Sequence, residues 1–278
     1  MPQAPIDAPR PPHPQAGFGA RRFGRWNTLG TWTLCVREVQ RFTNVWTQTL
    51  LAPIATAALF MAVFTLALGA RRGDVDGIPF VAFLAPGIVM MTVIQNAFAN
   101  TSSSIMISKI QGNIVDTLMP PLSATELLIG YAFGGVTRAL AVAAAAGTVA
   151  FLAAGIMPAH PLWLLWFAFA GGVIMSLVGV VAAVVANKFD QMSAITNFIV
   201  TPLSFLSGTF YSVAALPAWF SAVSHANPIF YLIDGFRFGA LGVSDTSPWI
   251  GLAVSAAVMA GLWAVCWRML ATGWRLKG

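Results

Sequence analysis

The side chains able to do acid–base, nucleophilic or metal chemistry are few in this sequence and lie far apart. The three histidines, His13, His160 and His225, fall in different segments, so no two of them form a metal-ligand pair on one helix. The two cysteines, Cys35 and Cys266, are also far apart, which supports neither a structural disulfide nor a metal site. The sequence therefore predicts no catalytic residue and no metal site.

Sequence motifs that bind nucleotides or carry a nucleophile are also missing. No G-x-x-x-x-G-K-[ST] segment occurs, so the chain lacks the loop with which proteins usually hold the phosphates of ATP. G-x-S-x-G and H-E-x-x-H, the marks of many hydrolases and zinc proteases, do not occur either. We expect a non-enzymatic protein with no cofactor of its own.

One charged residue lies deep inside an apolar stretch. Arg138 follows the start of the stretch 126–156 by about a dozen residues. An arginine at such a place pairs with another group or faces a polar cavity. The alternative is a side chain that reaches the membrane interface. Carboxylates are almost missing from the apolar stretches, which argues against a transporter coupled to protons or sodium ions.

Six long apolar stretches must position these residues. Of the 278 residues 58% are hydrophobic and only 9% are charged, whereas a soluble domain has about a quarter charged residues. A helix of about 20 apolar residues crosses the hydrocarbon core, where the backbone must satisfy its own hydrogen bonds. The predicted fold class is therefore an all-α integral membrane protein with six transmembrane helices. They are expected near residues 46–68, 80–102, 126–156, 161–186, 193–211 and 248–270.

The basic residues orient these helices. If the N-terminus is cytoplasmic, eleven of the 15 basic residues lie on the inner side: Arg10, Arg21, Arg22, Arg25, Arg37, Arg41, Lys109, Lys188, Arg268, Arg275 and Lys277. Only Arg71, Arg72 and Arg237 lie on the outer side. The positive-inside rule then places both termini in the cytoplasm. The basic residues that give the net charge of +6 flank the apolar spans. This pattern indicates membrane topology, and we therefore expect no nucleic-acid partner.

The N-terminal segment divides into a tail and a helix. Residues 1–20 are rich in proline and are predicted to be a disordered tail, so the membrane domain is assigned to 21–278. The first 40 residues contain no continuous apolar segment, so we expect no cleavable signal peptide.

Residues 22–43 have the pattern of an interfacial helix. Trp32, Cys35, Val39 and Phe42 share one face, while Arg37, Gln40, Arg41 and Asn44 share the other. Such a helix lies among the lipid headgroups. A simple polar approach to the first span is the alternative.

The inner segment between the second and third spans contains a second amphipathic pattern. Ile107, Ile110, Ile114 and Leu118 form one helical stripe, while Lys109, Asn113 and Asp116 point elsewhere. Pro120 and Pro121 end this helix. Ser123 and Glu126 then form a capping box that begins the third span. The helix is either a connection along the inner surface or a docking surface for a cytoplasmic partner.

The outer segment 207–247 is too apolar for a solvated loop and too interrupted for a clean span. Its aromatic residues include Phe210, Tyr211, Trp219, Phe220 and Tyr231, and its interruptions include Asn227, Pro228, Asp234 and Arg237. Asn227 can cap a helix that starts at Pro228. We expect a re-entrant hairpin of two short helices in the outer leaflet. A seventh, broken span is the alternative, but it would place the C-terminal basic residues outside.

Three stretches together resemble the ABC-2 type permeases, and within them the YadH-like group. They are GNIVDTLMPPLSATELLIG at 112–130, NKFDQMSAITNFIVTPLSFLSGTFYSV at 187–213 and LPAWFSAVSHANPIFYLIDGFRFGALG at 216–242. The third stretch is the most specific, with its LP-x-W, NP-x-x-Y and D-x-x-R. The resemblance covers about residues 30–270 and leaves out the Pro-rich tail.

The resemblance implies the permease subunit of an ATP-driven exporter in the bacterial inner membrane. Two permease chains would pair, as a homodimer, with two copies of a separate ATPase that holds ATP and Mg²⁺. Segment 105–118 would be the coupling helix, and the outer hairpin would close the exit of the path. Spans one, two and five would line much of the dimer interface and the path.

Two other functions stay open at this point. A secondary transporter or facilitator would work without ATP, and an assembly scaffold would transport nothing. An ATPase partner that copurifies with the chain would distinguish the permease from both.

Overall fold

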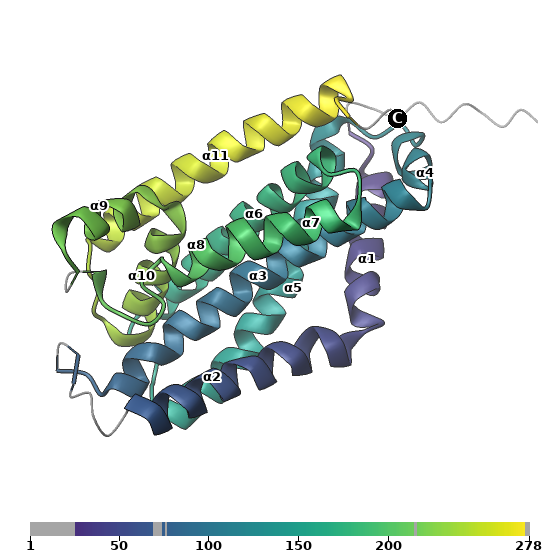
Figure 1. Cartoon of the computed structure of the whole chain (residues 1–278). Helices are drawn as coiled ribbons and strands as arrows, with labels where there is room; N and C mark the ends of the chain where they lie inside the picture. The colour runs from purple at the N-terminus through teal and green to yellow at the C-terminus, as the bar shows by residue number, and fades with distance from the viewer. Residues whose placement is uncertain (1–25, 69–73, 76, 214–215, 276–278) are drawn as a thin grey trace, which may run out of the picture.

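The computed structural model describes residues 26–68, 74–75, 77–213 and 216–275. Within this part the chain is helical, with no strand beyond one isolated bridge between Val75 and Ile78 (Figure 1). The predictions for the tail 1–20, for residues 71–72 and for residue 277 fall outside it. The helices, with η for a π-helical segment, are α1 (Thr28–Thr43), η1 (Thr47–Leu51), α2 (Ala52–Leu68), α3 (Phe80–Ile110), α4 (Ile114–Leu118), α5 (Ala124–Ala154), α6 (Pro161–Val185), α7 (Phe189–Ile195), η2 (Thr196–Val200), α8 (Thr201–Phe205), α9 (Ala218–Ala226), α10 (Pro228–Leu241) and α11 (Pro248–Thr272).

Five helices of the described part are long and apolar enough to cross a membrane. They are Thr47–Ala67, which joins η1 to α2, and the helices α3, α5, α6 and α11. Their positions confirm five of the predicted spans to within a few residues, except that α3 continues for eight residues beyond the predicted end at 102. Both α3 and α5 have 31 residues, so each is about 46 Å long.

The remaining predicted span, 193–211, is shorter in the structure. Its helix begins at Phe189, passes through the π-helical η2 and ends at Phe205. This length corresponds to about 25 Å, slightly less than the hydrocarbon core of about 30 Å. A sixth crossing therefore stays a prediction.

Helices α3 and α6 form the centre of the bundle. Most of their apolar surface is buried, whereas α2 and α11 bury little and lie on the outside (Figure 1). The two central helices approach closely at Gly179, where an added Cβ would lie 2.9 Å from the backbone oxygen of Phe98. Small residues at such a place let two membrane helices pack at short range.

The two ends of the bundle carry different elements. Helix α1, the short α4 and the C-terminal end of α11 lie at one end, while α9 and α10 lie at the other (Figure 1). The predicted inner and outer segments are thus at opposite ends. Helix α10 packs against α3, α6 and α11, which fixes the outer segment to the centre of the bundle.

Candidate functional site

The inner end of α3 and the helix α4 form the surface predicted to contact a partner. Helix α3 ends at Ile110, the chain turns over 111–113, and α4 begins at Ile114. Gly112 permits the turn, because its φ of +75° lies in the left-handed region that other residues rarely adopt. The prediction of one helix over 105–118 was therefore wrong in its boundaries: its first part extends α3, and only 114–118 forms a separate helix.

Apolar side chains are exposed on this surface. From the predicted stripe, Ile107, Ile110 and Leu118 are exposed, whereas Ile114 is half-buried. The sequence analysis missed Val115 and Met119, although Met119 is 76% exposed. Their spacing of four residues was the available signal. Apolar groups exposed next to a polar surface are typical of a protein contact. The predicted polar positions Asn113 and Asp116 are also exposed.

Lys109 has a partner within the chain. Its ammonium group donates hydrogen bonds to the backbone oxygens of Ala183 and Val184, both at 3.1 Å, and of Ala186 at 2.7 Å. These carbonyls end α6, where the last C=O groups have no partner inside the helix and a positive charge is favourable. Lys109 therefore joins the inner ends of α3 and α6.

A buried carboxylate that the sequence analysis missed joins α1 to α3. Glu38 is fully buried, and its Oε1 accepts hydrogen bonds from Arg37 Nη2 at 3.2 Å and from Ser104 Oγ at 2.8 Å. Its Oε2 lies 3.5 Å from Arg41 Nε. Gly134 of α5 leaves room for this side chain, since a Cβ there would meet the Glu38 stem. Gly130, one turn before Gly134, is in the same way close to Leu34, so these two glycines of α5 give α1 the room to pack closely.

Helix α1 lies within the segment 22–43 that was predicted to be helical, and its place among lipid headgroups stays a prediction. Cys35 and Phe42 of the predicted apolar face are buried, together with Leu34 and Glu38, whereas Trp32 is exposed. At its start, Asn27 accepts a hydrogen bond from Gly30 N at 3.0 Å and donates its own backbone N–H to Glu126. Glu126 also completes the predicted capping box with Ser123. The starts of α1 and α5 are therefore fixed to each other.

Arg138 is half-buried and is held by an amide. Its Nη2 donates to Asn96 Oδ1 on α3 at 2.9 Å. Among the described residues, no carboxylate lies within 4.0 Å of its guanidinium group. Arg138 lies about 21 Å along α5 from its first residue, Ala124, so it is near the middle of the bundle. The structure thus places an arginine deep in the membrane segment without an acidic partner.

At the opposite end, α9 and α10 form the predicted pair of short helices. Asn227 connects them: its Oδ1 accepts from Ile229 N at 3.1 Å, and Pro228 takes the first helical position, which confirms the predicted cap. The Asn227 Nδ2 donates to the Leu203 oxygen at 3.1 Å and to Ser207 Oγ at 2.7 Å. The turn of the hairpin is therefore attached to the end of α8. Entry of the pair into the outer leaflet stays a prediction.

Asp234 attaches α10 to the segment that leads into α11. Its buried carboxylate accepts hydrogen bonds from the N–H of Asp245 at 2.8 Å, and from the N–H and hydroxyl of Thr246 at 3.0 and 2.7 Å. Asp245 in turn accepts from Ser212 Oγ at 2.6 Å and from Val213 N at 2.7 Å. The two carboxylates thereby connect α10, the segment with Asp245 and Thr246, and the segment with Ser212 and Val213.

Arg237 lies one turn after Asp234 and is almost fully buried. Its Nη1 is 4.0 Å from the Asp234 carboxylate, its Nη2 donates to the Gly208 oxygen, and its guanidinium carbon lies 4.1 Å from the centre of the Phe83 ring. The side chain thus holds α10 against α3 and against the segment after α8. Arg237, which was predicted to lie on the outer side, is thus a buried side chain that holds the outer end together.

The predicted aromatic residues of the outer end divide between packing and exposure. The Phe210 ring lies 4.8 Å from that of Phe64 on α2. Trp219 is 70% exposed and meets Phe220 edge-on at 5.3 Å. The centre of the Tyr211 ring lies 6.4 Å from the centre of the Phe220 ring. The half-buried Tyr231 is in edge contact with Phe230.

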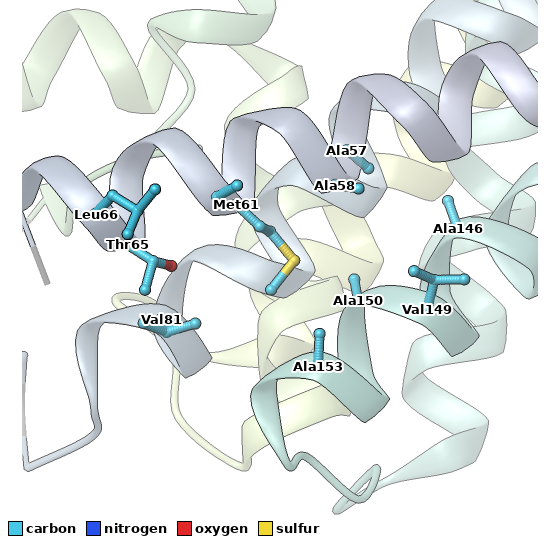
Figure 2. Close-up of a pocket in the computed structure, with 11 residues that line it drawn as sticks. Ala57, Ala58, Met61, Thr65, Leu66, Val81, Ala146, Val149, Ala150 and Ala153 are labelled. Carbon is cyan, nitrogen blue, oxygen red and sulfur yellow. The ribbon is translucent and has the colours of Figure 1, made fainter.

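An apolar cleft of about 390 Å³ lies between α2 and α5 near the outer end. Figure 2 shows its alanines on α5, opposite Met61, Thr65 and Leu66 of α2, with Val81 of α3 at the side. Its lining contains no charged residue. Such a cleft can take an acyl chain or an apolar side chain, but it has no group for chemistry.

The sequence is similar to known transport proteins over most of its length. A family model described as ABC-2 type transporter matches residues 30–241. The chain is 34% identical over 245 residues to the inner membrane transport permease YadH of Escherichia coli K12, which covers 88% of this chain and 96% of YadH. It is 28% identical over 218 residues to nodulation protein J of Sinorhizobium fredii, covering 76% and 80% of the two chains. Identity to nodulation protein J of Rhizobium leguminosarum bv. viciae is 26% over 226 residues, covering 79% and 84%.

Proposed function

Because the chain belongs to the ABC-2 type transporter family, we propose that it is the transmembrane permease subunit of an ATP-binding-cassette exporter. Family membership confirms the resemblance carried by the three stretches of the sequence. The similarity to YadH, an inner membrane transport permease, supports the same role and location for this chain. A secondary transporter that works without ATP is not favoured, because the family is that of ABC transporters.

The observation that carries this proposal is the exposed apolar surface at the end of α3 and on α4. A permease without a phosphate-binding loop must receive its energy from a separate ATPase, which would hold ATP and Mg²⁺. We assign Ile110, Val115 and Met119 to this contact, with Asn113 and Asp116 at its edge. Lys109 contributes indirectly, since it fixes the end of α3 to α6.

The proposed orientation places α1, α4 and the end of α11 in the cytoplasm, as the positive-inside rule predicts. The chain then crosses the membrane six times, with α7, η2 and α8 as the short fifth crossing. Helices α9 and α10 enter the outer leaflet and return, as a cover over the exit of the path. The aromatic cluster around Phe210 and the attachment of Asn227 to α8 support a hairpin that moves with the fifth crossing.

The proposed assembly is a homodimer of permeases with two ATPase subunits. The exposed apolar face of α2, which includes Leu59, Val63 and Leu66, supports a contact with lipid or with a second copy. ATP binding would bring the ATPases together and move the ends of α3 and α4. The two bundles would then shift between inward-open and outward-open states, an equilibrium that ATP biases.

Coexpression with a P-loop ATPase from an adjacent reading frame tests this proposal. We expect the two proteins to copurify, and the substitution Met119→Asp to reduce that copurification, because it places a charge in an apolar contact. Met157→Asp makes the same change at an exposed methionine in the loop between α5 and α6, away from this contact, and is the matched control that should leave the complex intact. Cargo movement by the chain alone against a gradient, without any ATPase, would contradict the proposal.

A further inference from the structure

A line of polar side chains runs along α3. Thr92, Asn96, Asn100 and Ser104 follow one another at intervals of four residues, so each lies next to the one before it and the line winds around the helix by about 40° at each step. Four residues of a helix rise about 6 Å, and the line therefore extends about 18 Å from the inner end towards the middle of the bundle. We call these four residues the polar track.

The polar track binds charged side chains from two neighbouring helices. Asn96 accepts a hydrogen bond from Arg138 of α5 at 2.9 Å. One turn closer to the inner end, the Oδ1 of Asn100 accepts a hydrogen bond from the Nη2 of Arg41 of α1 at 3.0 Å. At the inner end, Ser104 donates to Glu38 of α1. The helices α1 and α5 thus bring two cations and one carboxylate to the same line on α3.

Positive charge exceeds negative charge along this line. The Glu38 carboxylate is already shared between Arg37 and Arg41. Arg138 has only the neutral Asn96 as a partner among the described residues. A cation without a counter-charge is unfavourable in a membrane segment, and an anion bound beside it would relieve that cost.

Unsatisfied polar atoms gather at the same place. Within the described part, six buried side-chain polar atoms have no hydrogen-bond partner, and five of them lie on or beside the polar track. They are Asn100 Nδ2, Thr101 Oγ1 and Arg138 Nε, together with Glu38 Oε2 and Arg41 Nε, which lie 3.5 Å apart and form an ion pair with each other. Buried polar atoms almost always find a partner in native proteins. Four of these five groups can donate a hydrogen bond, as an oxyanion requires.

A cleft opens at the inner end of the polar track, beside Ser104. It has a volume of about 460 Å³ and lies between α1 and the α3–α4 segment. Ser104, Arg37 and Arg41 line it together with Glu38 and Asp116, so its wall has both charges. The volume is sufficient for a phosphate group with its neighbouring atoms.

We propose that the polar track, with Arg41 and Arg138, binds a phosphate-bearing head group that enters from the inner side. This inference rests on the proposed permease function, since it makes the cargo or its lipid carrier an anionic amphipath. The polar track would then hold the head group while the apolar part stays among the membrane-facing helices. The bound ligand is either the head group of an amphipathic molecule or free phosphate that enters from the cytoplasm.

Binding to the purified full-length chain in detergent, without any ATPase, tests the inference separately from the ATPase coupling. The probes are short-chain phosphatidylglycerol, the matching phosphatidylcholine and inorganic phosphate, and isothermal titration gives their affinities. We expect the chain to prefer phosphatidylglycerol to phosphatidylcholine by about tenfold or more. Displacement by millimolar inorganic phosphate would identify a site for the free anion. Failure of phosphate to displace the lipid would identify a site for the amphipath, and both results support an anion site.

Asn96→Asp is the decisive variant, because it places a carboxylate at the oxygen that Arg138 already contacts. Its affinity for phosphatidylglycerol should fall about tenfold, while its elution from a sizing column should be unchanged. Asn187→Asp makes the same charge change at an exposed position between α6 and α7 and should bind as the native chain does. Arg138→Lys should keep the preference and Arg138→Gln should lose it. Equal affinity of the native chain for both lipids, or an unchanged preference in Asn96→Asp and Arg138→Gln, would overturn the inference.

Discussion

The buried carboxylate of Glu38 offers the sharpest test of how α1 is attached to the bundle. The substitution Glu38→Gln keeps the volume of the side chain and removes only its charge. Three contacts change: the hydrogen bonds from Arg37 and Ser104 and the ion pair with Arg41. The expected loss of stability can be worked out for each of these contacts.

The three contributions differ because the partners differ in exposure. The bond from the buried Ser104 changes from charged to neutral, which costs about 1 kcal/mol. Arg41, whose Nε already lacks a hydrogen bond, loses the carboxylate that lies 3.5 Å away, which costs about 1–2 kcal/mol. The side chain of Arg37 is 46% exposed, so it can turn to water at a cost of about 0.5 kcal/mol. Together the unfolding free energy should fall by roughly 2–4 kcal/mol.

Thermal unfolding of the purified chain, followed by tryptophan fluorescence, measures this loss. For a chain of this size, about 2–4 kcal/mol corresponds to a fall in Tm on the order of 10 °C. The matched control is Asp116→Asn, which changes the net charge equally at an exposed position and should move Tm by no more than about 2 °C. If both variants unfold at the same temperature, Glu38 does not attach α1 as described.

Three further predictions concern other parts of the chain. Arg237→Met should lower the unfolding free energy by about 3 kcal/mol, because it leaves the Gly208 oxygen without its buried donor. Faster hydrogen exchange of the backbone over 206–213 would show that this segment is loosened. Unchanged exchange would contradict the described contact. Lys109→Ala should lower Tm by a few degrees, since the end of α6 loses its cation. The variant should still copurify with the ATPase. Loss of the complex in a stable variant would show that Lys109 contacts the ATPase directly. A cysteine at Trp219 should react with an impermeant thiol reagent from outside, and a cysteine at Met119 only from the cytoplasmic side; the reverse pattern would overturn the orientation.

The native cysteines make this labelling experiment clean. Cys35 and Cys266 are both buried and unpaired. Burial raises the pKa of the Cys35 thiol, so it is less ionised at neutral pH and less reactive towards the reagent. The native chain should therefore remain unlabelled from both sides of the membrane.

Features that depend on local chemistry were predictable from the sequence. The Asn227–Pro228 cap and the Ser123–Glu126 capping box follow from side chains that satisfy the first N–H groups of a helix, and both are confirmed. Five spans followed from length and hydrophobicity alone. The family followed from motifs in three stretches.

Features that depend on tertiary contacts were not predictable. Periodicity placed Lys109 off the apolar stripe but could not show its contact with α6, because the ends of α3 and α6 are not neighbours in sequence. It gave Glu38 no role, because only the folded chain brings Ser104 and Gly134 to it. The second span was placed at 80–102, but the helix continues to Ile110, past Ser102 and Ser104, which are buried in the folded chain.

The unbroken length of α3 has a mechanical consequence. A rod of about 46 Å that tilts by about 5° moves its far end by about 4 Å. Its outer part contains Pro86, which removes a backbone hydrogen bond near that end and makes it the natural pivot. A small displacement at Ile110 would therefore swing the helix about its outer end, with the largest movement at the cytoplasmic end and the smallest near Pro86.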